Sequence, residues 1–394
     1  LIYLPMTLFS ATFYPLAALP AWLHWIGWIS PLWHAAETGR VVAFGQPAGV
    51  GVMVWHVGYL AVLIALGWWS TCFLTRVQLH GVGWFSWLPR AVSDPADRVL
   101  ARVWRVLERV VYPGSRRVTP GAGSERLPGF LVGGPPPLRR TWAGPFRVLN
   151  RDLVAMRQFG WMPVLTGFFE PVLYLWSMGL GLGGYMGDQP AGGLAVPYPA
   201  FIAPALLATS AMNGAIFDST TNVFFKLHEI GTYKGMLATP LRPRDVALGE
   251  LTYALLRGLA YSVAFFIVAQ TFDLALSWWA VLAIPAATLV AFGFASLGFA
   301  ITSFLTSYRQ VDWIGFTLVP MFLLSGTFFP LADLPVAVQA VVQVFPLQHA
   351  VELIRGLMLG TVGWPLLAHA AYFVVLGIIG PIIASRRITK LFLD

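Results

Sequence analysis

A histidine, a glutamate and an arginine occur at the same spacing in two distant parts of the chain. Each follows the one before it by three positions, so in a helix the three side chains lie near one face. A histidine beside a glutamate is a candidate for zinc, but neither part supplies a further ligand nearby, so we do not expect a metal site. The residues are His34, Glu37 and Arg40 in the first part and His349, Glu352 and Arg355 in the second.

Glu170 is a single carboxylate within a long apolar run. If that run crosses a membrane, a charge near its centre costs about 2.5–3.5 kcal/mol on insertion scales. The side chain should then face protein or a wet cavity, or be protonated. Two interpretations stay open. Glu170 could belong to a substrate path or a dimer seam, or it could be a structural carboxyl bonded to a neighbouring helix.

The composition decides the environment of these residues. Hydrophobic residues make up 57% of the chain and charged residues 11%, whereas a soluble domain carries about 25% charged residues. The chain is therefore predicted to be a polytopic membrane protein. A single cysteine, Cys72, excludes an internal disulfide and a cysteine-based metal cluster.

The positive charge is concentrated in one stretch of the chain. Residues 75–160 carry a net charge of +9, and the rest of the chain carries −1. This charge predicts that residues 75–160 lie in the cytoplasm beside anionic lipids rather than on a nucleic acid.

Part of the sequence is duplicated. Residues 4–45 align without a gap onto 319–360, and a two-residue slip then brings His56 and Tyr59 onto His369 and Tyr372. A repeat of this length indicates duplicated domains, because solenoid repeats have periods of roughly 20–50 residues. The chain opens within an apolar run, so we expect a first unit that lacks its N-terminal part.

We predict an all-α integral membrane fold with three parts. Residues 1–74 hold the last two spans of one unit, and 75–144 form a basic cytoplasmic linker with a surface helix at 94–112 and disorder at 113–140. Residues 145–394 hold an interfacial helix followed by six spans. The eight predicted spans are 1–15, 51–74, 162–183, 199–217, 247–270, 278–303, 313–329 and 364–385.

The loop charges predict the orientation. Arginines and lysines place both ends of 145–394 in the cytoplasm and the segment 330–362 outside. Prolines bracket that outer segment, so it should form short re-entrant or interfacial helices rather than one span. On this view the two His–Glu–Arg sets form a plug or gate at the outer mouth. Arg257, inside a span, is expected to snorkel to the cytoplasmic face.

The segment 145–394 resembles the permease subunits of type 2 ATP-binding-cassette (ABC) exporters, most closely the nodulation-protein-J and daunorubicin-resistance branch. The resemblance rests on FFEPVLYLWSMGLGLG at 168–183, VFFKLHEIGTYKGMLATPLRPRDVALGEL at 223–251, LLSGTFFPLADLP at 323–335 and PLQHAVELIRGLMLG at 346–360. The first copy matches the last two spans of such a unit and the outer segment between them. The resemblance implies a permease paired with a second permease unit in the bacterial plasma membrane.

The resemblance also implies a separate ATPase subunit, and the chain has no G-x-x-x-x-G-K-[ST] phosphate loop of its own. ATP and magnesium are therefore expected on that partner, and no cofactor on this chain. The family carries its ATPase-coupling helix after the second span, whereas an ordinary solvated loop is the plainer interpretation of the same stretch. The coupling role would fall to Phe225, Lys226, Leu227, Glu229, Tyr233, Lys234 and Met236.

The sequence thus predicts the membrane-spanning permease of an exporter for an amphiphilic substrate, whether a lipo-oligosaccharide, a drug or a lipid. An ion-coupled secondary transporter is one alternative, and it would show intramembrane carboxylates in both halves. A membrane-embedded lipid-linked glycosyl or acyl transferase is another, and it would need a cluster of polar catalytic residues at one membrane face. We find no such cluster in the sequence and expect no enzymatic activity from this chain.

Overall fold

The computed structural model describes residues 3–44, 49–80, 143–159 and 162–392. The predicted surface helix at 94–112 and the segment 113–140 lie outside these ranges. The chain divides into two units. The first unit comprises residues 1–113, 172–188 and 197–199, and the second comprises 114–171, 189–196 and 200–394.

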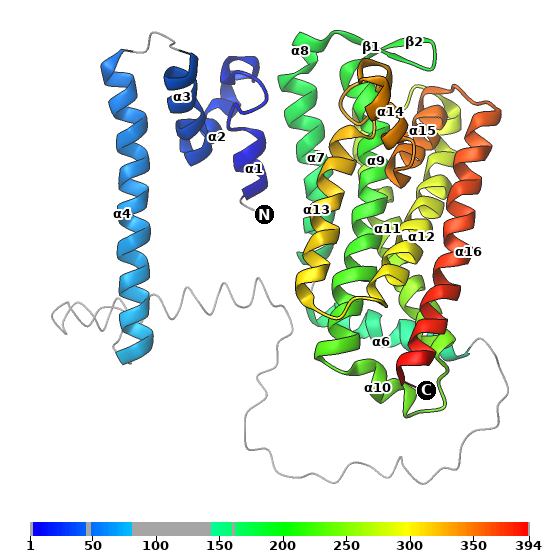
Figure 1. Ribbon diagram of the computed structural model, residues 1–394. Coiled ribbons are helices and arrows are strands. Elements are labelled where there is room, and N and C mark those ends of the chain that lie inside the picture. The colour runs from blue at the N-terminus through cyan, green and yellow to red at the C-terminus, as the bar shows by residue number, and fades with distance from the viewer. Residues whose placement is uncertain (1–2, 45–48, 81–142, 160–161, 393–394) are drawn as a thin grey trace. The chain divides into compact units, whose positions relative to one another are not determined.

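The N-terminal elements of the first unit are short helices followed by one long helix (Figure 1). They are α1 (Tyr3–Leu8), the 3-10 turns η1 (Leu16–Ala18) and η2 (Ala21–Leu23), α2 (His24–Ile29), α3 (Pro31–Phe44) and α4 (Val50–His80). The predicted span at 1–15 is therefore shorter than expected, because the described helix ends at Leu8. Ala11 adopts a positive φ of 57°, which a continuing α-helix does not allow.

Helices also dominate the rest of the described chain. In order, its first elements are α6 (Ala143–Phe159), α7 (Met162–Gly181), α8 (Gly183–Met186), β1 (Asp188–Ala191), β2 (Leu194–Pro197), α9 (Tyr198–Phe217), η3 (Asp218–Asn222), η4 (Phe225–Glu229) and α10 (Thr232–Leu237). The later elements are α11 (Pro243–Thr271), η5 (Trp278–Leu282), α12 (Ala283–Thr302), α13 (Tyr308–Leu324), η6 (Leu331–Asp333), α14 (Val336–Val342), α15 (Pro346–Leu359) and α16 (Trp364–Phe392). The small β1–β2 hairpin was not predicted from the sequence.

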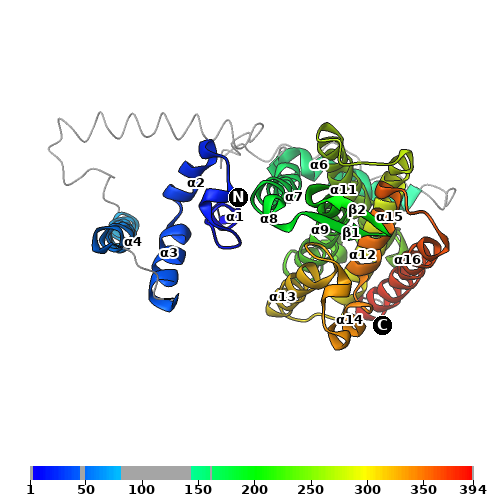
Figure 2. The same cartoon turned by 90° about the horizontal axis from the view of Figure 1, so that it is seen from above.

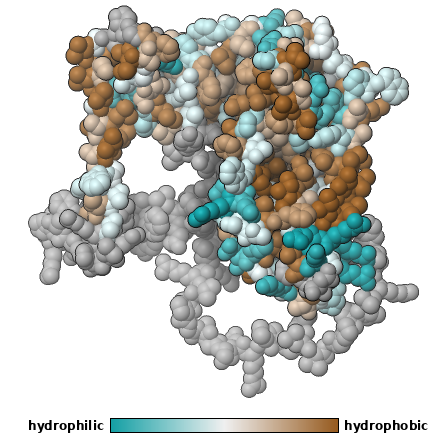
Figure 3. All heavy atoms as spheres, viewed as in Figure 1, coloured by the Kyte–Doolittle hydropathy of each residue, from teal (hydrophilic) through white to brown (hydrophobic). Residues whose placement is uncertain are grey.

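Among the described residues, five helical segments are long and apolar enough to cross a membrane. They are Val50–Phe73, Tyr198–Glu229, Pro243–Thr271, Trp278–Thr302 and Trp364–Leu391. Figure 3 shows hydrophobic residues along the flank that carries α16, where Val375, Ile378 and Ile382 are exposed, and hydrophilic residues near the end that carries α10. An apolar flank above a polar end is what a bilayer requires, so the all-α membrane fold is confirmed.

Helix α9 forms the centre of the second unit. Seen from above, it lies among α11, α12 and α13 (Figure 2), and most of its length is buried. Small residues allow the helices to approach closely. A Cβ atom on Gly214 would lie 2.8 Å from the Cα atom of Gly258, and one on Gly258 would lie 2.7 Å from the Cβ atom of Ala291. The alanine stripe Ala287, Ala291 and Ala295 is buried, as close helix packing predicts.

Local signals set the ends of two helices beside the site. Pro243 occupies the first turn of α11, and the side chain of Asp245 accepts a 3.0 Å hydrogen bond from the backbone amide of Arg242. Ser307 and Gln310 form a capping box at the start of α13. Helix α13 then ends at Leu324, five residues before the predicted limit, because Gly326 adopts a positive φ of 69°.

The segment after α13 turns back on itself, as its prolines predicted. Helices α14 and α15 meet at 88°, with Pro346 in the first turn of α15. Helix α15 ends at Gly360, which takes the left-handed conformation. The segment predicted to lie outside is therefore a bent helical pair, and its helix α15 packs against α16 and α12.

Candidate functional site

A cavity of about 850 Å³ lies in the second unit between the helices that surround α9. Its wall combines apolar and aromatic side chains with a small number of charged ones, a common composition for a ligand site. The apolar and aromatic residues are Ala155, Met156, Ile216, Phe217, Phe225, Ile230, Tyr253, Tyr261, Tyr308, Val311, Ile314 and Leu318. The charged residues are Arg151, Asp152, Glu170, Lys226, Arg257 and Asp312.

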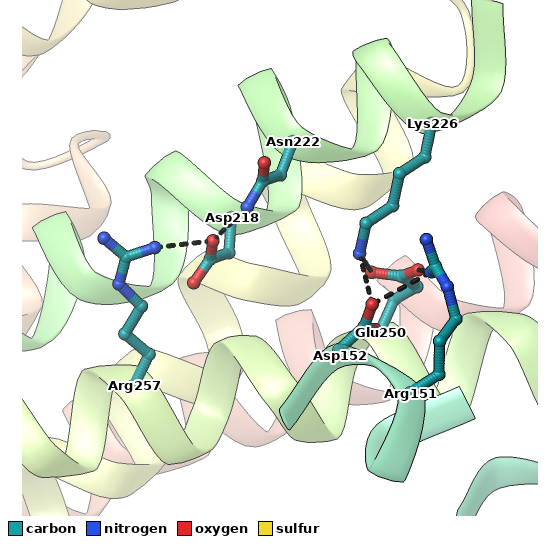
Figure 4. Close-up of polar contacts among 7 residues, drawn as sticks. All are labelled: Arg151, Asp152, Asp218, Asn222, Lys226, Glu250 and Arg257. Atoms are coloured by element: carbon teal, nitrogen blue, oxygen red, sulfur yellow. Dashed lines mark hydrogen bonds and ion pairs between the residues drawn. The ribbon is translucent and has the colours of Figure 1, made fainter. Parts of the chain in front are cut away.

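Lys226 holds together three separate helical segments at the edge of this cavity. Its Nζ atom lies 2.6 Å from Oε2 of Glu250 on α11 and donates a 2.9 Å hydrogen bond to Oδ1 of Asp152 on α6. Arg151 also donates to Oδ1 of Asp152, at 2.9 Å. Figure 4 shows Lys226 reaching from η4 to the two carboxylates, with Arg151 beside them. Both carboxylates are buried, so the amine has little competition from water.

A second ion pair lies about two helical turns away along α11. Arg257 on α11 donates to Oδ1 of Asp218 at 2.8 Å and to the hydroxyl oxygen of Tyr261 at 2.8 Å. Asn222 donates to the same oxygen of Asp218 at 2.6 Å. The expectation that Arg257 snorkels to the cytoplasmic face is therefore wrong. Its guanidinium is mostly buried and pairs with the carboxylate of Asp218.

The backbone around these residues is unusual. Helix α9 continues into η3 and η4, and both of these segments are π-helical. Isolated π-helical turns within α-helices are rare in proteins, and those that occur are often found at functional sites. Asp218 and Asn222 belong to η3 and Lys226 belongs to η4, so both ion pairs depend on this local geometry.

Three buried carboxylate oxygens have no hydrogen-bond partner among the described residues: Oδ2 of Asp152, Oδ2 of Asp218 and Oε1 of Glu250. Arg151 is within 3.9 Å of the last of these, which is an ion pair without a hydrogen bond. A buried carboxylate that is only partly satisfied costs stability. Stability alone therefore does not account for this network.

The predicted coupling residues divide into two groups. Leu227 and Tyr233 are buried and Lys226 points into the charged network, so these three anchor the segment to the second unit. Burial raises the pKa of the Tyr233 hydroxyl well above its usual value. The remaining residues are exposed or half-exposed and are available to a partner: Phe225, Glu229, Lys234 and Met236.

Glu170 lines the cavity and is half-buried. This position fits the interpretation that its side chain faces a wet cavity. Helix α7 continues through Pro171 directly after it, and the ring of that proline removes one backbone hydrogen bond.

The two His–Glu–Arg sets make matching contacts in the two units. In α15, Arg355 donates to Glu352 at 3.2 Å and to the carbonyl oxygen of Gly326 at 2.6 Å. In α3, Arg40 donates to Glu37 and to the carbonyl oxygen of Ala11. Ala11 and Gly326 are equivalent positions of the repeat. The duplicated sequence therefore preserves individual hydrogen bonds.

The histidines of these sets do not act together with the arginines. Nδ1 of His349 lies 2.8 Å from Nδ1 of His369 on α16, and His34 and His56 repeat this contact at 2.8 Å. The histidine and the arginine of each set thus have different partners, and the role of these sets as an outer gate stays a prediction. The arginine turns towards the preceding loop and the histidine turns towards the following helix. Among the described residues, no group of three or more potential ligands could hold a metal ion.

Sequence reasoning missed four partners in these contacts. Asp152, Asp218 and Glu250 were not selected, and His369 was noted only as a repeated residue. Asp218 and Glu250 lie at or within apolar helical segments, so the signal applied to Glu170 was available for them. Asp152 lies in an amphipathic helix among arginines and gave no such signal. Their partners come from distant positions, and helical spacing does not reveal such pairs.

Comparison with known proteins gives a consistent result. Residues 1–44 and 146–359 match the family described as ABC-2 type transporter. The chain is 35% identical over 224 residues to nodulation protein J of Sinorhizobium fredii, covering 56% of this chain and 84% of that protein. It is 30% identical over 247 residues to nodulation protein J of Rhizobium meliloti, covering 61% and 92% respectively. A probable multidrug ABC transporter permease of Escherichia coli, YbhR, is 28% identical over 192 residues, covering 44% and 50%.

Proposed function

Since the chain belongs to the ABC-2 type transporter family, we propose that it is the membrane-spanning permease of an exporter and that a separate ATPase drives it. ATP and magnesium are bound by that ATPase. The permease works beside a second permease unit in the bacterial plasma membrane, with the α10 end in the cytoplasm. Its substrate is an amphiphile, a class that includes lipo-oligosaccharides, drugs and lipids.

One observation carries this proposal. Lys226 joins the segment that we assign to ATPase docking directly to two buried carboxylates beside the cavity. Phe225 and Glu229 are exposed on the same short segment, and exposed apolar and charged side chains together suit a protein partner. A movement of the docked segment would therefore reach α6 and α11 through this lysine.

The cavity supports the amphiphilic substrate class. Ile314, Leu318 and Met156 offer an apolar wall, whereas Glu170 and Asn213 offer polar groups on the same cavity. A ligand with an apolar and a polar part satisfies both surfaces, because each polar group left unpaired in such a site costs free energy.

The test is a docking experiment with two exposed substitutions, Glu229→Ala and Lys234→Ala. The double variant should insert normally, co-purify less ATPase and stimulate ATP turnover less. Asp333→Ala, which removes an exposed charge from η6, is the matched control and should leave both measurements unchanged. Unchanged complex formation and turnover in the double variant would contradict the docking role.

Glu170→Gln tests the cavity separately from docking. This variant should keep the ATPase bound at the wild-type level, whereas the increase in turnover that substrate produces should change. An equal substrate response in the wild type and Glu170→Gln would exclude Glu170 from the substrate path.

A further inference from the structure

In each unit, a histidine on a short helix contacts a histidine on the long helix that follows: α3 with α4, and α15 with α16. We call each of these helix pairs an outer module. The proposed function does not use the histidine contact. In each unit, two imidazoles face each other through their Nδ1 atoms at 2.8 Å. One Nδ1 must carry a proton and donate it, and the other must be unprotonated and accept it. This contact is therefore sensitive to the protonation state of both rings.

The neighbouring contacts identify the donor. Nε2 of His34 lies 2.9 Å from the carbonyl oxygen of Trp28, which can only accept, so Nε2 of His34 carries a proton. His34 is then neutral only if its Nδ1 accepts from His56. In the second unit, Gln343 holds the position of the repeat that Trp28 holds in the first, and its backbone acts on His349, so we assign the same proton arrangement there. His349 is therefore the acceptor in the second unit and His369 is the donor.

The pair tolerates one added proton but not two. A proton on Nε2 of His369 leaves its Nδ1 hydrogen bond intact. A proton on Nδ1 of His349 removes the only acceptor and sets two N–H groups and two positive charges against each other. A histidine titrates near pH 6.5 when it is unperturbed, so the second protonation belongs to more acidic conditions.

The surroundings do not supply a substitute partner. The charged groups that act on His369 are His349 and Glu352, and Arg355 already holds Glu352 on the same helix. The ring of Tyr372 lies against His349, with the ring centroids 4.2 Å apart and the ring planes at 32°. Helix α12 and the turn η5, which also pack in this region, contain no titratable residue. The charged residues Glu250 and Arg257 of α11 are bound in the network beside the cavity.

The charged and aromatic groups around the His34–His56 contact in the first unit are of the same kinds. Glu37 and His34 are the charged groups that act on His56, and Arg40 holds Glu37. Tyr59 stacks on His34 at 3.9 Å. His24, from α2, is bound to the carbonyl oxygen of Leu19.

We propose that His349 and His369 form a proton-operated clasp, which holds the outer helix α15 against α16 at neutral pH and releases it in acid. His34 and His56 form the equivalent clasp between α3 and α4. The chain thus carries a pH-responsive contact on each copy of its outer module. Release requires both imidazoles to be cationic, so the clasp opens as the pH falls and closes as it rises.

The test is hydrogen–deuterium exchange of the full chain in lipid nanodiscs at pH 7.5 and pH 5. Exchange of residues 346–359 is compared with that of α12, which corrects for the chemical pH dependence of exchange. In the wild type, the relative protection of 346–359 should fall several-fold at pH 5. His369→Asn should remove this fall, because an amide occupies the place of Nδ1 and can donate to or accept from His349.

Two further variants keep the result interpretable. His228→Asn, which removes an exposed imidazole from η4, should retain the wild-type pH response. His56→Asn should abolish the response of residues 31–44 alone, which tests the first copy even if His369→Asn does not fold. Constant protection of 346–359 between the two pH values, or an identical fall in the wild type and His369→Asn, would overturn the proposal. Neither outcome depends on the ATPase or on transport.

Discussion

Lys226 lies between two carboxylates that come from different helices, Asp152 on α6 and Glu250 on α11. Such an arrangement contributes little net stability, because three charged groups lose most of their hydration. Removing only the lysine is nevertheless costly, since it leaves two carboxylates buried close together. The three residues therefore depend on each other more than their individual contributions indicate.

Lys226→Met is expected to destabilise the second unit by about 3–5 kcal/mol, the cost of leaving buried charges unpaired. Lys226→Met with Glu250→Gln should recover part of this loss, because only one charge then needs a partner. Thermal unfolding in detergent measures both. Lys234→Met, at an exposed position, serves as the control and should change stability by less than about 0.5 kcal/mol. Equal unfolding temperatures for the single and double variants would contradict the expected recovery and thus the coupling between Lys226 and Glu250.

Arg355 and Glu352 form an unequal pair. Arg355 is buried, donates to the carbonyl oxygen of Gly326 and lies 4.2 Å from the ring centroid of Phe201, whereas the Glu352 side chain is 39% exposed. Arg355→Ala should therefore cost about 2–3 kcal/mol, and Glu352→Ala should cost less because water replaces the carboxylate. Chemical denaturation of the two variants tests this order, and a larger effect of Glu352→Ala would contradict it.

At the scale of the elements, close packing joins α9, α11 and α12. Gly214 and Gly258 leave no room for a side chain between these helices, and Ala291 fills the remaining space. Without a hydrophobic driving force between helices in lipid, such approach by small residues is a main source of association. The π-helical segments η3 and η4 extend α9 beyond this contact and carry Asp218 and Lys226 to their partners.

Gly258→Ala is expected to lower the unfolding temperature, although alanine is the better helix former, because the added methyl would lie 2.7 Å from the Cβ atom of Ala291. Gly67→Ala in α4 is the matched control. Its Cβ would meet nothing within 4 Å, so this change should be neutral or stabilising by up to about 1 kcal/mol. Similar effects of the two substitutions in a thermal-shift assay would argue against tight packing at Gly258.

At the scale of the whole molecule, the chain combines a long permease segment with a second copy of the outer module. Both copies keep the arginine hydrogen bonds and the histidine pair. The outer module is thus a local structure that forms twice from similar sequences. The charges on the connecting segments predict the orientation of both copies in the membrane.

Orientation is tested by replacing Cys72 and introducing single cysteines at Thr239 and Asp333, which are both exposed. On intact cells, a membrane-impermeant thiol reagent should label the cysteine at 333 directly. The cysteine at 239 should react only after the cells are permeabilised. Labelling at 239 without labelling at 333 would reverse the proposed topology.

The sequence by itself determined the class of this protein. Its apolar runs and proline positions predicted an all-α membrane fold and the bent segment after α13, because these features depend on local spacing and on hydropathy. Only the tertiary structure decided which charges meet. Lys226 pairs with Asp152 and Glu250, and Arg257 pairs with Asp218, in each case between different helical segments. Helical periodicity carries no information about such pairs. The structure also showed that His349 and Arg355 contact different neighbours, because the elements packed around the helix, and not the spacing along it, decide the partners.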